Sequence, residues 1–141
     1  MSPAIKAIQK PQVMEISMDV LVLENDADIA QALSEVIQDM GHSVEKFYSC
    51  ADVLNRIEQQ TFDLVLLDVF LPDGKGHHLV PRFKELWPDI WIVTMTGDNT
   101  PELEAEVRKQ GIVYYMAKPF EAEVIREILN HIAKKKKGGG R

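Results

Sequence analysis

The feature that most constrains the fold is a repeated alternation of short apolar runs with segments of helical periodicity. Residues 64–67 (LVLL) form the clearest run, since every position is apolar, as in a parallel strand buried on both faces. Four other runs are similar, and between them apolar residues recur at the spacing of one helix face. The expected strands are residues 19–23, 43–48, 64–67, 90–95 and 112–116.

Local signals place the helices between these strands. Ser49 and Thr100 are residue types that cap helix N-termini, and Gly41 and Gly111 suit helix ends. Five strands alternating with five helices predict an α/β fold, in which one parallel sheet is covered by helices on both faces. The apolar positions of the expected helices fall within residues 29–40, 53–57, 77–87, 101–110 and 121–133.

Polar residues follow several of the expected strands directly. In open parallel sheets, ligands bind beyond the carboxyl ends of the strands, so these residues should share one edge. Converging acids favour a hard cation with oxygen ligands, typically Mg²⁺. A carboxylate beside Mg²⁺ can attack an activated phosphoryl group if a lysine and a hydroxyl help to neutralise it. The candidate residues are Glu24, Asn25, Asp68, Thr96 and Lys118.

Composition narrows the function classes further. A chain of 141 residues suits one domain, and its net charge of -6 argues against a nucleic-acid-binding domain. The single cysteine, Cys50, excludes an internal disulfide and fits a reducing, cytoplasmic setting. No apolar stretch suggests a signal peptide or a membrane span, so we expect a cytoplasmic protein that does not contact membranes.

The chain divides into three expected segments. Residues 1–17 carry two prolines and weak periodicity, and we interpret them as an N-terminal extension. Residues 18–133 form the domain, and residues 134–141 (KKKKGGGR) form a basic, glycine-rich tail or a truncated linker. A solvated tail is the favoured interpretation, and an electrostatic contact with an acidic partner or a lipid surface is the alternative.

Four segments, LVLEND, LLDVFLPDGKG, VTMTG and YYMAKPF, resemble the signature segments of the two-component response regulator receiver family, which has the CheY-like fold. The resemblance covers about residues 19–133 in matching order and spacing. It implies a flavodoxin-like strand order, 2-1-3-4-5. It also implies a signalling switch that catalyses only its own phosphorylation and dephosphorylation and is not a metabolic enzyme.

The resemblance gives each strand-end residue a role. Asp68 would be the phosphoacceptor, Lys118 would contact a phosphoryl oxygen, and Thr96 would hydrogen-bond the phosphoryl group. Thr96 and Tyr115 would form the switch, and the peptide before Pro119 is often cis in this family. The implied Mg²⁺ ligands are the side chains of Glu24, Asn25 and Asp68 and the backbone carbonyl of Phe70.

Partners follow from the same resemblance. A sensor histidine kinase or a phosphotransfer protein would phosphorylate the domain. The surface of the fourth helix, fifth strand and fifth helix would then bind a downstream protein or an output domain. Neither nucleic acid nor membrane is an expected direct partner, and a homodimer stays open.

Asn25 departs from the family pattern, which usually has two acids after the first strand. An amide oxygen can coordinate Mg²⁺ but carries no charge, so we expect weaker Mg²⁺ binding than with aspartate. A degenerate receiver that acts without phosphorylation is therefore the alternative function. Phe70 and Asp98 flank the expected phosphoryl position and are the residues expected to influence dephosphorylation.

Three other interpretations carry less weight. A phosphohydrolase of the haloacid-dehalogenase type needs a second aspartate two residues after its nucleophile, where this chain has Phe70. A flavodoxin-like flavin binder needs a phosphate-binding loop after the first strand, where the acidic ENDAD would repel a phosphate. His77 and His78 suggest metal ligands, but adjacent helical residues point apart, which favours solvated histidines.

Overall fold

Five parallel strands form the main sheet of the computed structural model, which describes residues 16–138. Their spatial order is β2-β1-β3-β6-β7, which is 2-1-3-4-5 when they are numbered along the chain, so the predicted order is confirmed. The central strand β3 is buried at every position, as its continuous apolar run predicts. The strands are β1 (Asp19–Leu23), β2 (Ser43–Phe47), β3 (Leu64–Asp68), β6 (Trp91–Thr96) and β7 (Tyr114–Ala117).

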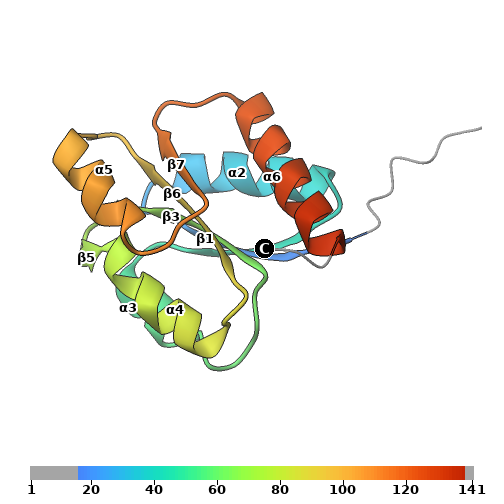
Figure 1. Cartoon of the computed structure of the whole chain (residues 1–141), viewed down its shortest axis with the longest axis horizontal. Helices are drawn as coiled ribbons and strands as arrows, with labels where there is room; N and C mark the ends of the chain where they lie inside the picture. Colours follow the sequence, from blue (N-terminus) through green and yellow to red (C-terminus); the bar gives the residue numbers. More distant parts are fainter. Residues whose placement is uncertain (1–15, 139–141) are drawn as a thin grey trace, which may run out of the picture.

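Helices cover both faces of the sheet, with α2 and α6 on one face and α3 and α4 on the other (Figure 1). Side chains alternate along each strand, so Val20 packs toward α2 and α6 while Leu21 packs toward α3 and α4. The two faces therefore carry separate apolar cores. The helices are α2 (Ala27–Asp39), α3 (Cys50–Leu54), α4 (Val80–Leu86), α5 (Pro101–Arg108) and α6 (Ala122–Lys137).

Helix boundaries follow the predicted capping residues. The Ser49 hydroxyl accepts a hydrogen bond from the Asp52 amide at α3, and the Thr100 hydroxyl accepts one from Leu103 at α5. Gly41 follows α2 with a φ of 93°, a left-handed conformation that glycine adopts without steric cost. The local signals in the sequence thus located these helix ends correctly.

The segment at residues 77–87 differs from the single helix that was expected. A 3₁₀ helix, η1 (Gly76–Leu79), precedes α4, and Pro81 lies in the first turn of α4. Proline has no amide proton and suits that position, so the α-helix begins just before it. Before η1, the short strands β4 (Phe70–Leu71) and β5 (Gly74–Lys75) form an antiparallel hairpin.

Both chain ends depart from the predicted segment limits. Helix α6 continues to Lys137, beyond the predicted end at 133, because lysines in a last turn interact favourably with the helix dipole. Lys136 also pairs with Asp63 at 3.0 Å. Of the predicted extension, Ile16 packs against the core, whereas residues 1–15 and 139–141 lie outside the described part.

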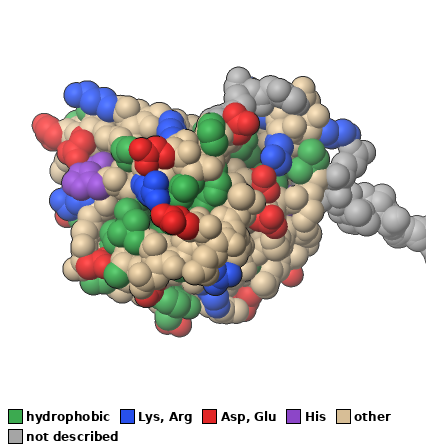
Figure 2. Space-filling view, turned by 90° about the horizontal axis from the view of Figure 1, so that it is seen from below, with side chains coloured by type: hydrophobic (Ala, Val, Ile, Leu, Met, Phe, Trp, Pro, Cys, Tyr) green, Lys and Arg blue, Asp and Glu red, His purple; other side chains and the backbone are tan. Residues whose placement is uncertain are grey.

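Charge on the outer surface is mixed. Figure 2 shows acidic and basic side chains interspersed on the face that α3 and α4 cover, with apolar side chains between them. Within residues 16–138, no helix has both the length and the apolar character needed to cross a bilayer.

Candidate functional site

Asp68 is the last residue of β3, at the carboxyl edge of the sheet. Its neighbours in the sheet are β1 and β6, and its Cα is in register with Met95. The residue is 6% exposed, so its carboxylate lies in a recess with limited access to water. One carboxylate oxygen accepts a hydrogen bond from the Phe70 amide at 3.2 Å. This places an anionic group at the edge where ligands bind in such sheets.

Lys118 joins two of the predicted acids. Its Nζ lies 2.8 Å from Asp68 Oδ2 and 2.5 Å from Glu24 Oε1. Burial lowers the pKa of the Lys118 ammonium, but its hydrogen bonds to Asp68 and Glu24, and their charges, outweigh this and raise the pKa overall. The lysine is therefore a cation at neutral pH, held between two carboxylates.

The backbone on either side of Lys118 explains how its side chain reaches Asp68. The Lys118 amide donates to the Thr96 carbonyl at 2.8 Å, which holds the end of β7 against β6. The peptide between Lys118 and Pro119 is cis, as the resemblance implied.

Glu24 is almost fully buried, at 1% exposure. Its Oε2 accepts a hydrogen bond from the Asp26 amide at 2.9 Å. Burial raises the pKa of the Glu24 carboxyl, Lys118 and the Asp26 amide lower it, and the negative charge of Asp68 raises it again. Two carboxylates thus share one ammonium, which leaves an excess of negative charge in a recessed site.

The excess negative charge of the two carboxylates suits a divalent cation such as Mg²⁺. Glu24 and Asp68 are oxygen ligands, and their mutual repulsion would be relieved by a second cation. Asn25 lies exposed in the loop after β1. Asp26 accepts hydrogen bonds from Asp28 and Ile29 as the N-cap of α2. The Asp26 carboxylate is therefore engaged at the start of α2.

Thr96 and Tyr115 are linked through one loop. Thr96 is fully buried at the end of β6, and its hydroxyl accepts a hydrogen bond from the Asp98 amide at 3.1 Å. Tyr115 lies on β7, and its hydroxyl donates to Asn99 Oδ1 at 2.5 Å. The loop that follows Thr96 therefore contacts both residues of the predicted switch.

Two residues that follow β3, Gly76 and Asp73, make close contacts that support the site and that the sequence did not indicate. A Cβ atom on Gly76 would lie 2.0 Å from the Asp68 carbonyl oxygen, so only glycine allows this close approach. Asp73 accepts hydrogen bonds from the amides of Cys50 and Ala51, at 2.9 and 3.0 Å, and so ties the turn to the start of α3. The Pro-Asp-Gly sequence at residues 72–74 is typical of a turn, but it could not reveal these contacts.

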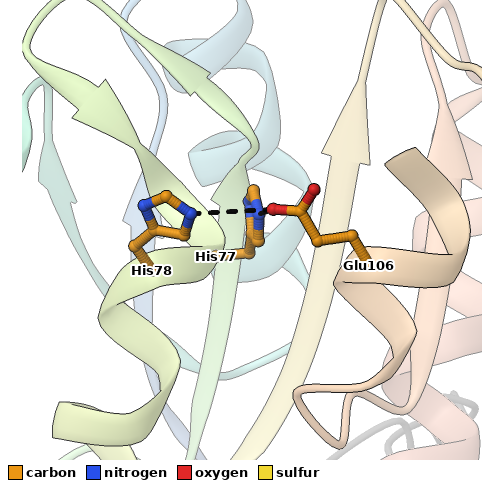
Figure 3. Close-up of side chains that lie close together, drawn as sticks. All are labelled: His77, His78 and Glu106. Atoms are coloured by element: carbon orange, nitrogen blue, oxygen red, sulfur yellow. Dashed lines mark hydrogen bonds and ion pairs between the residues drawn. The ribbon is translucent and has the colours of Figure 1, made fainter. Parts of the chain in front are cut away.

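The prediction that both adjacent histidines are solvated is wrong for His77. Its side chain is fully buried, whereas that of His78 is 63% exposed. Both rings point a nitrogen at the same carboxylate oxygen of Glu106 (Figure 3). The reasoning failed because the contact of His77 with Glu106 joins two distant segments, η1 and α5. The two rings are tilted by 60° with their centroids 4.5 Å apart.

Comparison with known proteins is consistent with this geometry. Residues 20–130 match the response regulator receiver domain family. The chain is 31% identical over 112 residues to the transcriptional regulatory protein ZraR of Salmonella typhimurium, covering 79% of this chain and 25% of ZraR. It is 27% identical over 110 residues to the DNA-binding transcriptional regulator NtrC of Azospirillum brasilense, covering 78% of this chain and 23% of NtrC.

Solved structures agree on the fold. The BeF3-activated DrrB receiver domain superposes with a TM-score of 0.77 and 27% identity, covering 84% of this chain and 99% of that one. A CheY-like receiver domain protein from Methanospirillum hungatei has a TM-score of 0.82 and 23% identity, covering 89% and 100%. The chain spans about a quarter of the length of ZraR and NtrC. From the family match and the geometry together, the chain belongs to the response regulator receiver domain family, a family of signalling domains.

Proposed function

We propose that this domain is a phosphorylation switch in which Asp68 accepts a phosphoryl group from a sensor histidine kinase or a phosphotransfer protein. The observation that carries the proposal is the ammonium of Lys118, which lies within 2.8 Å of Asp68 Oδ2 and pairs with Glu24 as well. A nucleophilic carboxylate with a cation beside it can approach a phosphoryl group without excessive repulsion.

The chemistry assigned to the site is an in-line transfer. A carboxylate oxygen of Asp68 forms a bond to phosphorus, while the bond from phosphorus to the donor breaks and the donor keeps the electron pair. Lys118 then neutralises one phosphoryl oxygen. When bound, Mg²⁺ would neutralise further charge on the phosphoryl oxygens. Its proposed ligands are Glu24, Asp68, the amide oxygen of Asn25 and the carbonyl of Phe70.

The switch is proposed to run through the loop after β6. The Thr96 hydroxyl accepts a hydrogen bond from the Asp98 amide, and its own proton is free to be donated to a phosphoryl oxygen, which is a strong acceptor. If Thr96 turns toward the phosphoryl group, the loop moves and strains the hydrogen bond from Tyr115 to Asn99. The charge of the phosphoryl group would then shift the equilibrium between two positions of the Tyr115 side chain.

The proposed output surface consists of α5, β7 and α6, which are the fourth helix, fifth strand and fifth helix predicted from the sequence. Tyr115 lies on it, and Val124 of α6 is 37% exposed. A downstream protein, an output domain or a second copy could bind there. A related structure is described as the beryllofluoride-activated NtrC4 receiver domain dimer. We place the domain in the cytoplasm, where histidine kinases donate phosphoryl groups.

Treatment with acetyl phosphate and Mg²⁺, followed by intact mass spectrometry, tests the proposal. We expect the mass of one phosphoryl group to be added to the wild type and to Asp89→Asn, whose carboxylate lies exposed in a turn before β6. Asp68→Asn should stay unmodified. An unmodified wild type would contradict the proposal and favour the degenerate receiver, which acts without phosphorylation.

A further inference from the structure

Three side chains meet between η1 and α5, and none of them contacts Lys118 or the two acids that it pairs with. His77 Nε2 lies 2.7 Å from Glu106 Oε2, and His78 Nε2 lies 3.6 Å from the same oxygen. One potential ligand atom from each residue lies within 4.8 Å of the others. Figure 3 shows the two rings approaching this oxygen from η1 while the carboxylate reaches toward them from α5.

We propose that His77, His78 and Glu106 form a binding site for a divalent transition-metal ion of the Zn²⁺ type, distinct from the acidic site at Asp68. Two imidazole nitrogens and one carboxylate are the ligands of known catalytic zinc sites, and a fourth position stays open to water. Mg²⁺ does not suit this set, because it prefers oxygen ligands in octahedral geometry.

The distances fit a tetrahedral ion after small adjustments. Metal–ligand bonds of about 2.0–2.1 Å place tetrahedral ligand atoms roughly 3.3 Å apart. The distances from Glu106 Oε2 to His77 Nε2 and to His78 Nε2, 2.7 and 3.6 Å, lie on either side of that value. His77 is fixed by complete burial, whereas the side chains of His78 and Glu106 are 63% and 55% exposed and can adjust. Because two of the three ligands are more than half exposed, an ion has access from solvent.

The second ring nitrogen of His77 limits the expected affinity for the metal ion. His77 Nδ1 is buried and has no hydrogen-bond partner among the described residues. A metal-bound histidine normally donates its other N–H to an acceptor, and losing such a partner costs about 10–100-fold in affinity. We therefore expect binding that is weaker than in structural zinc sites.

A bound ion would link the two segments that flank the phosphoacceptor. η1 begins at Gly76, whose amide donates to the Val69 carbonyl at 2.7 Å, next to Asp68. Helix α5 follows the loop after Thr96, and within it only Val107 is buried. The ion would thus fix a helix that has few apolar contacts. Its effect on the switch rests on the proposed function, whereas the ion site itself does not.

Titration of metal-free protein with Zn²⁺, followed by calorimetry, tests the site, and Co²⁺ absorption reports the geometry. We expect one equivalent of metal and the visible bands of tetrahedral Co²⁺. His78→Ala and Glu106→Gln should each weaken Zn²⁺ binding by more than about tenfold. The loss of a metal ligand should cost at least as much affinity as the loss of a hydrogen-bond partner of a ligand. Both residues are exposed, so these variants should fold.

Controls separate this site from other metal ligands. His131→Ala and Cys50→Ser should bind Zn²⁺ as the wild type does. No binding by the wild type, or equal binding by His78→Ala and Glu106→Gln, would overturn the proposal. The readout needs no phosphoryl donor, so it is independent of whether Asp68 is phosphorylated.

Discussion

Replacing Gly76 with alanine should destabilise the domain strongly. The added Cβ would lie 2.0 Å from the carbonyl oxygen of Asp68 and 2.9 Å from a methyl carbon of Leu67, whereas real Cβ contacts below 3.0 Å essentially never occur. The first of these atoms is backbone at the end of the central strand, so no flexible side chain can move aside. Overpacking of this kind costs typically about 1–3 kcal/mol, and the rigid neighbour places this variant near the upper limit.

Urea unfolding measured by tryptophan fluorescence is the assay. Trp87 and Trp91 are 7% and 5% exposed and lie in the two different apolar cores, so the signal reports on both faces of the sheet. With an m-value of about 1–3 kcal/mol/M, a loss of about 3 kcal/mol lowers the midpoint by about 1–3 M.

Gly97→Ala is the matched control. A Cβ there would lie 3.9 Å from the Lys118 Cβ, which is an ordinary van der Waals distance, so this variant should unfold close to the wild-type midpoint. A Gly76→Ala protein that unfolds at the same midpoint as Gly97→Ala would refute the argument from close backbone approach.

Three further predictions concern the site and its supports. Asn25→Asp should tighten Mg²⁺ binding by adding a charged ligand, and comparing Mg²⁺ titrations by NMR would show equal affinities if the reasoning fails. Hydrogen bonds from the Cys50 and Ala51 amides lower the pKa of Asp73 below 3.8. The ionised Asp73 carboxylate therefore stabilises the folded protein fully above that pH, and this contribution is lost as the pH falls through the folded-state pKa. The difference in urea midpoint between wild type and Asp73→Asn should therefore shrink in acid, and a constant difference would contradict this. Tyr115→Phe should change the NMR shifts of residues 97–100 without any phosphodonor, because the hydrogen bond to Asn99 is lost; unchanged shifts would remove that link from the switch.

Much of the fold could be predicted because its signals are local. Apolar runs such as residues 64–67 predict buried strands, and capping residues such as Thr100 predict helix starts, since both depend on neighbours close in sequence. The carboxyl ends of the strands in a parallel sheet share one edge, so the sequence also predicted that Glu24 and Asp68 lie near each other. The family resemblance also implied that Lys118 pairs with Asp68, as it does. The second pairing of Lys118, with Glu24, was not predicted, because it depends on how distant segments pack.

One wrong prediction and two features that the sequence did not reveal have a common cause. His77 was expected in solvent, yet its burial and its contact with Glu106 depend on α5, which lies 29 positions further along the chain. Asp73 was part of a recognised turn, but its hydrogen bond to the Cys50 amide joins residues 23 positions apart. The need for glycine at position 76 likewise comes from a strand that ends eight positions earlier, at Asp68.

The sequence by itself therefore determined the alternation of strands and helices, the two-sided apolar cores and the set of polar residues at the strand ends. These follow from periodicity and capping, which are properties of short windows of chain. Only the tertiary structure decided which carboxylates share Lys118, which histidine is buried and which glycine is required. These depend on distances between segments far apart in the sequence, and packing in three dimensions sets those distances.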